Sequence, residues 1–151
     1  FSVGLKELFS VFTNGYKPNK HITLLFNAIC NCNGFKPDDI TSQNDELINY
    51  SKSITLENLY QNINSLDDNK NDDRYYSRIS AIGLYTLIKQ LPECENIKIE
   101  KLDNEIAKMA DVIGYPTERV EKDISLFRSN IEKMNQALEI ISLNTSSKKN
   151  K

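Results

Sequence analysis

Apolar residues recur at intervals of three and four over the first 34 residues, which is the spacing of one face of an α-helix. Two runs show this period, one over residues 1–13 and one over residues 18–33. Gly15 follows the first run and Gly34 follows the second, and both can adopt the left-handed backbone that commonly ends a helix. The pattern therefore predicts two helices joined by a short turn, a helical hairpin.

The next segment keeps the helical period less regularly. Pro37 can open a third helix, with Asp38 and Asp39 in the first turn, where they complement the positive end of the helix dipole. The apolar stripe of this helix is thin, so we expect it to be peripheral. A short fourth helix is predicted over residues 53–64, with Thr55 as its N-cap.

Residues 65–74 are polar and show no period, so they cannot bury enough apolar surface to order themselves, and we predict a mobile loop. Its acidic residues are Asp67, Asp68, Asp72 and Asp73. They resemble a calcium-binding loop only in composition, because the regular alternation and the terminal Glu of such a loop are absent. The pattern favours a solvated loop.

Residues 75–91 form the most apolar segment, and their apolar side chains are spread around most of the helix circumference. This distribution predicts a central, largely buried helix. Gly83 within it would let another helix approach closely, and Pro92 would end the helix.

The last third carries the most regular pattern. Apolar residues keep strict three-four spacing over residues 99–113 and again over residues 120–141. With Gly114 as a C-terminal stop and Thr117 as an N-cap, the connection is short enough to force an antiparallel helical hairpin. The second arm is longer than the first. We therefore expect Leu138 and Ile141 to find another partner, either inside the domain or on a second protein.

The heptads also permit a homodimer through the last helix, as an alternative to intramolecular packing. The positions flanking the heptad stripe are poor in complementary charge, which favours the intramolecular hairpin. The fold prediction is an all-α helical bundle that ends in an antiparallel hairpin with a long C-terminal helix. Residues 1–143 are predicted to form one domain and residues 144–151 a disordered basic tail. The pattern starts in mid-helix at Phe1, so we expect an N-terminal part of the domain to precede it.

The composition makes several classes of function unfavourable. The chain of 151 residues has 19 Lys and Arg against 21 Asp and Glu, a net charge of −2, which disfavours nucleic-acid binding. Three cysteines supply neither a zinc tetrad nor an even disulfide framework, so free thiols are expected. No apolar run is long enough for a membrane span.

The chemistry available for catalysis is scarce, with one histidine and five glycines. His21 and Cys30 lie nine residues apart on one predicted helix, about 13 Å along its axis, which excludes a Cys–His nucleophile pair. We predict no catalytic residue, no metal and no cofactor. A structural polar cluster of Tyr16, His21, Tyr76 and Arg78 is the one arrangement of polar side chains that we expect.

Three runs resemble the thylakoid formation and photosystem II biogenesis family of cyanobacteria and plastids. They are Gly15-Tyr16-Lys17-Pro18 with residues 25–30 and 34–37, Tyr76-Ser77-Arg78 with residues 81–87, and Val120-Glu121-Lys122-Asp123 with residues 128–134 and 137–139. The resemblance covers residues 1–141. Lys36 departs from the Asp that the family often has there, so the helix that follows Pro37 is expected to be less firmly capped.

The resemblance implies an all-helical, non-enzymatic accessory protein, bound peripherally to the cytoplasmic or stromal face of the thylakoid. It implies partners among photosystem II assembly intermediates and the FtsH protease, whose accumulation the family supports. We expect the FtsH contact at Leu138 and Ile141 on the last helix and at Asp67, Asp68, Asp72 and Asp73 in the loop. The alternative is a coiled-coil scaffold that dimerises and organises photosynthetic membranes without a protease partner.

Overall fold

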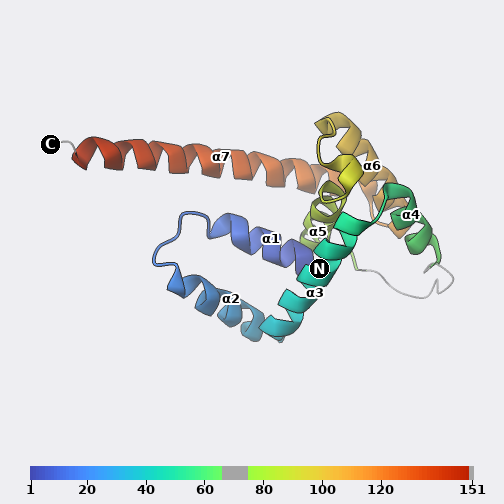
Figure 1. The fold of residues 1–151 in the computed structure, drawn as a ribbon, viewed down its shortest axis with the longest axis horizontal. Coiled ribbons are helices and arrows are strands. Elements are labelled where there is room, and N and C mark those ends of the chain that lie inside the picture. Colours follow the sequence, from blue (N-terminus) through green and yellow to red (C-terminus); the bar gives the residue numbers. More distant parts are fainter. Residues whose placement is uncertain (66–74, 150–151) are drawn as a thin grey trace.

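The computed structural model describes residues 1–65 and 75–149, which form seven α-helices and one short 3-10 helix (Figure 1). The helices are α1 (Ser2–Phe12), α2 (Lys20–Cys32), α3 (Pro37–Ser53), α4 (Leu56–Ser65), α5 (Arg78–Lys89), η1 (Pro92–Cys94), α6 (Ile99–Ile113) and α7 (Thr117–Lys149). Within the described ranges there is no β-strand. The all-α prediction is confirmed.

Helix α5 is the centre of the fold, as its apolar circumference predicts. It contacts α1, α3, α6 and α7, and seven of its twelve residues are buried. The side chain of Ser77 caps its N-terminus by accepting a hydrogen bond from the Ser80 amide at 3.0 Å. The main core gathers around this helix and includes Ile88, Met109 and Val120.

Two glycines let α1 and α5 cross in close contact. A Cβ atom at Gly4 would overlap the carbonyl oxygen of Ile79, and a Cβ at Gly83 would lie 3.1 Å from the amide nitrogen of Gly4. The close approach predicted at Gly83 is therefore confirmed. Its partner is Gly4 of the first helix, which the sequence pattern did not single out.

The first two helices form an open hairpin, with a second small core between them. Phe26 and Cys30 of α2 are buried there with Ile40 of α3, and the rings of Phe9 and Phe26 lie 5.1 Å apart. Gly15 in the connection has a φ of 80°, as the predicted stop requires. In Figure 1, α1 lies between α2 and α7.

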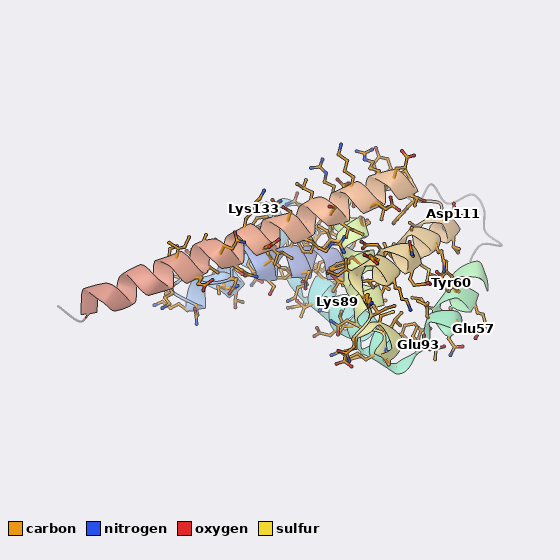
Figure 2. The ribbon with its side chains drawn as sticks, turned by 90° about the horizontal axis from the view of Figure 1, so that it is seen from above. Glu57, Tyr60, Lys89, Glu93, Asp111 and Lys133 are labelled. Atoms are coloured by element: carbon orange, nitrogen blue, oxygen red, sulfur yellow. The ribbon has the colours of Figure 1, made fainter. Side chains whose placement is uncertain are left out.

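Helix α3 is less peripheral than its thin apolar stripe predicts. It contacts α1, α2 and α5, and Ser51 is buried near its end. A small side chain of this kind lets the helix pack closely without contributing to an apolar stripe. At the next helix, the predicted cap is confirmed, because the hydroxyl of Thr55 accepts from the Asn58 amide at 3.2 Å. Glu93, labelled in Figure 2, also accepts a hydrogen bond from the Leu56 amide at 3.0 Å.

Helices α6 and α7 form the predicted antiparallel pair. Gly114 ends α6 in the left-handed conformation, with a φ of 82°. The Pro116 carbonyl accepts from the Val120 amide at 3.0 Å, so Thr117 is the first residue of α7 rather than its N-cap. Helix α7 continues through Lys149, past the predicted end at residue 143, and its C-terminal part extends beyond the other helices in Figure 1.

Candidate functional site

A buried carboxylate on α7 organises the polar side chains at the centre of the molecule. Asp123 is only 7% exposed, and each of its oxygens has a partner. The Tyr76 hydroxyl donates to Oδ2 at 2.6 Å, and Nε of Arg78 lies 3.0 Å from Oδ1. A buried charge is tolerated only when it is paired and hydrogen-bonded in this way. The arrangement ties the start of α5 to α7.

Tyr76 is held on further sides by the connection between α6 and α7 and by the first turn of α7. Its ring meets that of Tyr115 edge-on at 5.5 Å, and the Arg119 guanidinium lies 5.3 Å from its centre. Burial, and then the hydrogen bond to Asp123, raise the pKa of Tyr76 well above its ordinary value. The phenol therefore stays protonated and acts as a hydrogen-bond donor, which suits a structural role and not that of a general base.

The structure divides the predicted polar cluster into two parts. Tyr76 and Arg78 do meet, at Asp123, but Tyr16 and His21 lie elsewhere. Tyr16 lines a hollow of about 830 Å³ between α1, α2 and the start of α3, and His21 is in the first turn of α2. The two parts are separated because they lie against different positions along α7. Gly15 packs against Leu138, fifteen residues and about 22 Å along the helix from Asp123.

A second ion pair fixes the register of α6 against α7. Arg128 donates from both terminal nitrogens to the two oxygens of Asp103, at 2.8 and 2.9 Å. This two-point hydrogen bonding raises the pKa of Arg128. A bidentate Arg–carboxylate pair adds geometric specificity as well as energy. The sequence pattern gave no role to this pair.

The distal part of α7 carries a leucine that packs inside the domain and two isoleucines with exposed side chains. A Cβ at Gly15 would lie 2.6 Å from Cδ2 of Leu138, so Leu138 covers the α1–α2 connection. The expected partner of Leu138 thus lies inside the domain. Ile140 and Ile141 are 59% and 58% exposed. The loop residues Asp67, Asp68, Asp72 and Asp73 lie outside the described residues.

The three cysteines are free thiols, as predicted. Cys30 and Cys94 are buried, whereas Cys32 is exposed. Burial raises the pKa of the Cys30 thiol, and burial followed by the charges of Glu93 and Glu105 raises that of Cys94. Neither buried thiol is activated as a nucleophile, because the thiolate is the reactive form.

Neither a metal cluster nor a membrane span is found in the part of the chain that the structure describes. No three His, Cys, Asp or Glu side chains in it are arranged to hold a metal ion. None of its helices is both long and apolar enough to cross a bilayer.

Known proteins resemble this chain along its whole length. The model of the thylakoid formation protein family matches residues 1–151. Protein Thf1 of Prochlorococcus marinus strain NATL1A is 52% identical over 149 residues, which cover 98% of this chain and 74% of that protein. Protein Thf1 of Synechococcus sp. strain CC9605 is 34% identical over 152 residues, which cover 100% of this chain and 70% of that protein.

A solved structure agrees with these matches. The structure of Psb29 at 1.55 Å superimposes with a TM-score of 0.83 and 25% sequence identity, covering 99% of this chain and 74% of that one. The family resemblance of the three sequence runs is thereby confirmed, and so is the fold that it implied. This chain belongs to the thylakoid formation protein family.

Proposed function

We propose that this chain is a non-enzymatic accessory factor in photosystem II biogenesis and repair and in thylakoid membrane organisation. It acts by binding the FtsH protease and maintaining it, at the cytoplasmic or stromal face of the thylakoid. Membership of the thylakoid formation family and the likeness to Psb29 support the general role. The site chemistry is consistent with it, since the buried polar groups described above are engaged in structural contacts.

The observation that carries the partner assignment is the extension of α7 beyond the other helices (Figure 1). Ile140 and Ile141 follow Leu138 by two and three residues towards the C-terminal end of α7, and both are exposed. Leu138 packs onto Gly15 and is half-buried. The candidate FtsH contact is therefore best assigned to Ile140 and Ile141, with Leu138 setting the position of the extension relative to α1 and α2.

The alternative, a homodimeric scaffold, would use the exposed face of α7 that carries Leu126 and Ile140. These residues are fourteen apart, so the helical repeat places Lys133 midway between them on the same face. Lys133 is labelled in Figure 2. In a parallel homodimer, and in an antiparallel one centred there, Lys133 would face its own copy. Like charges at such a position oppose pairing, so the observation favours a different protein as the partner.

Affinity capture from solubilised thylakoids tests the proposal. The bait is the tagged chain, either unchanged or carrying Ile140→Lys and Ile141→Lys together. Ile99→Lys serves as the matched control, because Ile99 is an exposed isoleucine on α6. We expect the unchanged bait and the control to recover FtsH, and the double variant to recover at least tenfold less.

Equal recovery of FtsH by all three baits would overturn the site assignment, and no recovery by any would overturn the protease partner. Light scattering at micromolar concentration examines the alternative. We expect a monomeric mass. A dimer that Ile140→Lys dissociates would support the scaffold instead.

A further inference from the structure

Helix α2 presents an apolar face to solvent. Leu24 is 65% exposed, and Leu25 and Ile29 are 39% and 42% exposed. At 100° per residue, these three share a sector of about 140° with Ala28 and Cys32, which are also exposed, and with His21 of the first turn, which is half-buried. We call the five exposed residues the outer face of α2.

The opposite side of α2 accounts for its contacts inside the protein. Phe26 and Cys30 are buried there, against Leu5 and Phe9 of α1 and Ile40 of α3. In Figure 1, α2 lies at the lower margin of the fold, and α1 separates it from α7. A helix that is apolar on both sides, with one side packed, presents a second apolar surface, which no other part of the chain that the structure describes covers.

The charge around this face differs from that of the rest of the chain. Residues 1–36 contain four lysines and one acidic residue, Glu7, a net charge of +3. Residues 37–151 contain 15 Lys and Arg against 20 Asp and Glu, a net charge of −5. Helix α2 itself contains no acidic residue, and the next acids along the chain, Asp38 and Asp39, begin α3.

The lysines are placed at the two ends of the outer face. Lys17 and Lys20 lie at the start of α2, and Lys36 follows its end. All three are exposed. An exposed apolar helix face bordered by lysines is the arrangement that binds the surface of an anionic bilayer, with the apolar side chains among the acyl chains and the lysines at the headgroups.

We propose that the outer face of α2 docks on a membrane surface that carries anionic lipid. The inference rests on the proposed thylakoid role for its choice of a membrane, and it adds the surface and the lipid charge. A second copy of the chain is a poorer occupant, because pairing two such faces would bring two hairpins of net charge +3 together.

Vesicle binding by the 151-residue chain tests the docking face. The vesicles are pure phosphatidylcholine, or phosphatidylcholine with about a third of phosphatidylglycerol. We expect co-sedimentation with the anionic vesicles alone, and a steep loss of binding as salt is raised. A fluorophore on Cys32, the exposed thiol of the outer face, should shift its emission to the blue on binding.

Two sets of variants locate the contact. Leu24→Asp with Ile29→Asp should weaken binding at least tenfold, while Leu126→Asp with Ile140→Asp, on the exposed side of α7, should leave it unchanged. Replacing Lys17, Lys20 and Lys36 by Gln should weaken it about a hundredfold. The matched replacement of Lys98, Lys101 and Lys122, also exposed, should have little effect because these lysines lie in acidic surroundings.

The proposal is overturned if the α2 variants bind anionic vesicles as well as the unchanged chain, or if each control loses as much affinity as its counterpart. It is also overturned if the chain dimerises through α2 without vesicles, because a second copy then covers the face. The FtsH capture is scored separately with the same α2 variants. Vesicle binding without FtsH recovery would refute the proposed partner alone, and FtsH recovery without vesicle binding would refute the docking face alone.

Discussion

The Tyr76 hydroxyl donates a 2.6 Å hydrogen bond to the buried carboxylate of Asp123, 47 residues further along the chain. Because the acceptor is charged and buried, we expect Tyr76→Phe to lower the free energy of unfolding by about 2 kcal/mol. Urea denaturation measures this change. Tyr75→Phe is the matched control, since Tyr75 is 90% exposed and its loss should cost nothing measurable.

Arg78 contacts the same carboxylate but its side chain is mostly exposed. Its replacement by Gln should therefore cost less than about 1 kcal/mol, as for other solvent-screened ion pairs. The reverse order, with Arg78→Gln more damaging than Tyr76→Phe, would contradict the view that the hydrogen bond from Tyr76 is the main support of Asp123.

Helices α1 and α5 cross at Gly4 and Gly83, and alanine at these two positions should lower the free energy of unfolding by different amounts. A methyl group at Gly4 meets the Ile79 backbone, which cannot move aside, so Gly4→Ala should cost about 3 kcal/mol. At Gly83 the clash is milder, and the better helix propensity of Ala, about 1 kcal/mol, offsets part of it.

Thermal or urea denaturation compares the two, with Gly34→Ala as the control. Gly34 has a positive φ but open space around its Cβ position, so it isolates the backbone penalty of about 1 kcal/mol. A Gly4→Ala protein as stable as Gly34→Ala would show that the two helices do not cross so closely.

The helices, and those of their ends that a glycine marks, were predictable from the sequence, because periodicity and glycine stops are local signals. Gly15, Gly34 and Gly114 each adopt the positive φ that the pattern required. The burial of Asp123 was not predictable in this way. Asp123 flanks the apolar stripe in the heptad pattern. Its burial is tolerated because Tyr76, two residues before α5, donates a hydrogen bond to it. One signal was present, since Asp123 lies beside the apolar stripe of Val120, Ile124 and Phe127.

The partner of Leu138 was hidden for a related reason. The apolar pattern shows that α7 is longer than α6. It does not show what covers Leu138, because the covering residue is a glycine in a turn and carries no apolar side chain. Tyr16 and His21 were misplaced because the sequence does not show how far the α1–α2 connection lies from the start of α5. Packing between distant segments sets both distances.

From the contact between Leu138 and Gly15 we expect α7 to stabilise the α1–α2 connection. Leu138→Ala should lower the free energy of unfolding by about 1–2 kcal/mol, because a half-buried leucine loses part of its burial. Hydrogen exchange should also accelerate in the amides of residues 13–19. Ile140→Ala, two residues away and exposed, should change neither quantity. Unchanged hydrogen exchange in Leu138→Ala would contradict a stabilising contact between Leu138 and Gly15.

The three thiols should differ sharply in reactivity. Cys32 is exposed, whereas Cys30 and Cys94 are buried and have raised pKa values. An aromatic disulfide reagent at pH 8 should therefore modify one thiol at least a hundredfold faster than the other two, which react as the protein opens. Cys32→Ser should abolish the fast phase. A fast phase of two thiols would contradict the burial of Cys30 or of Cys94.

Tyr60 makes the stability of the protein depend on pH in the alkaline range. The hydroxyl of Tyr60, a residue labelled in Figure 2, lies 3.2 Å from Oε2 of Glu105. Burial, followed by the charge and hydrogen bond of that carboxylate, raises the pKa of Tyr60 from 10 to about 12. Between pH 10 and about 12 the unfolded chain has lost this proton while the folded protein retains it. The free energy of unfolding contributed by Tyr60 is thus fully present below pH 10 and is lost as the pH rises towards 12. We expect the urea midpoint to fall less steeply between pH 9 and 11.5 in Tyr60→Phe than in the unchanged protein. Parallel curves for the two proteins would show that Tyr60 titrates as an ordinary tyrosine and is not held against Glu105.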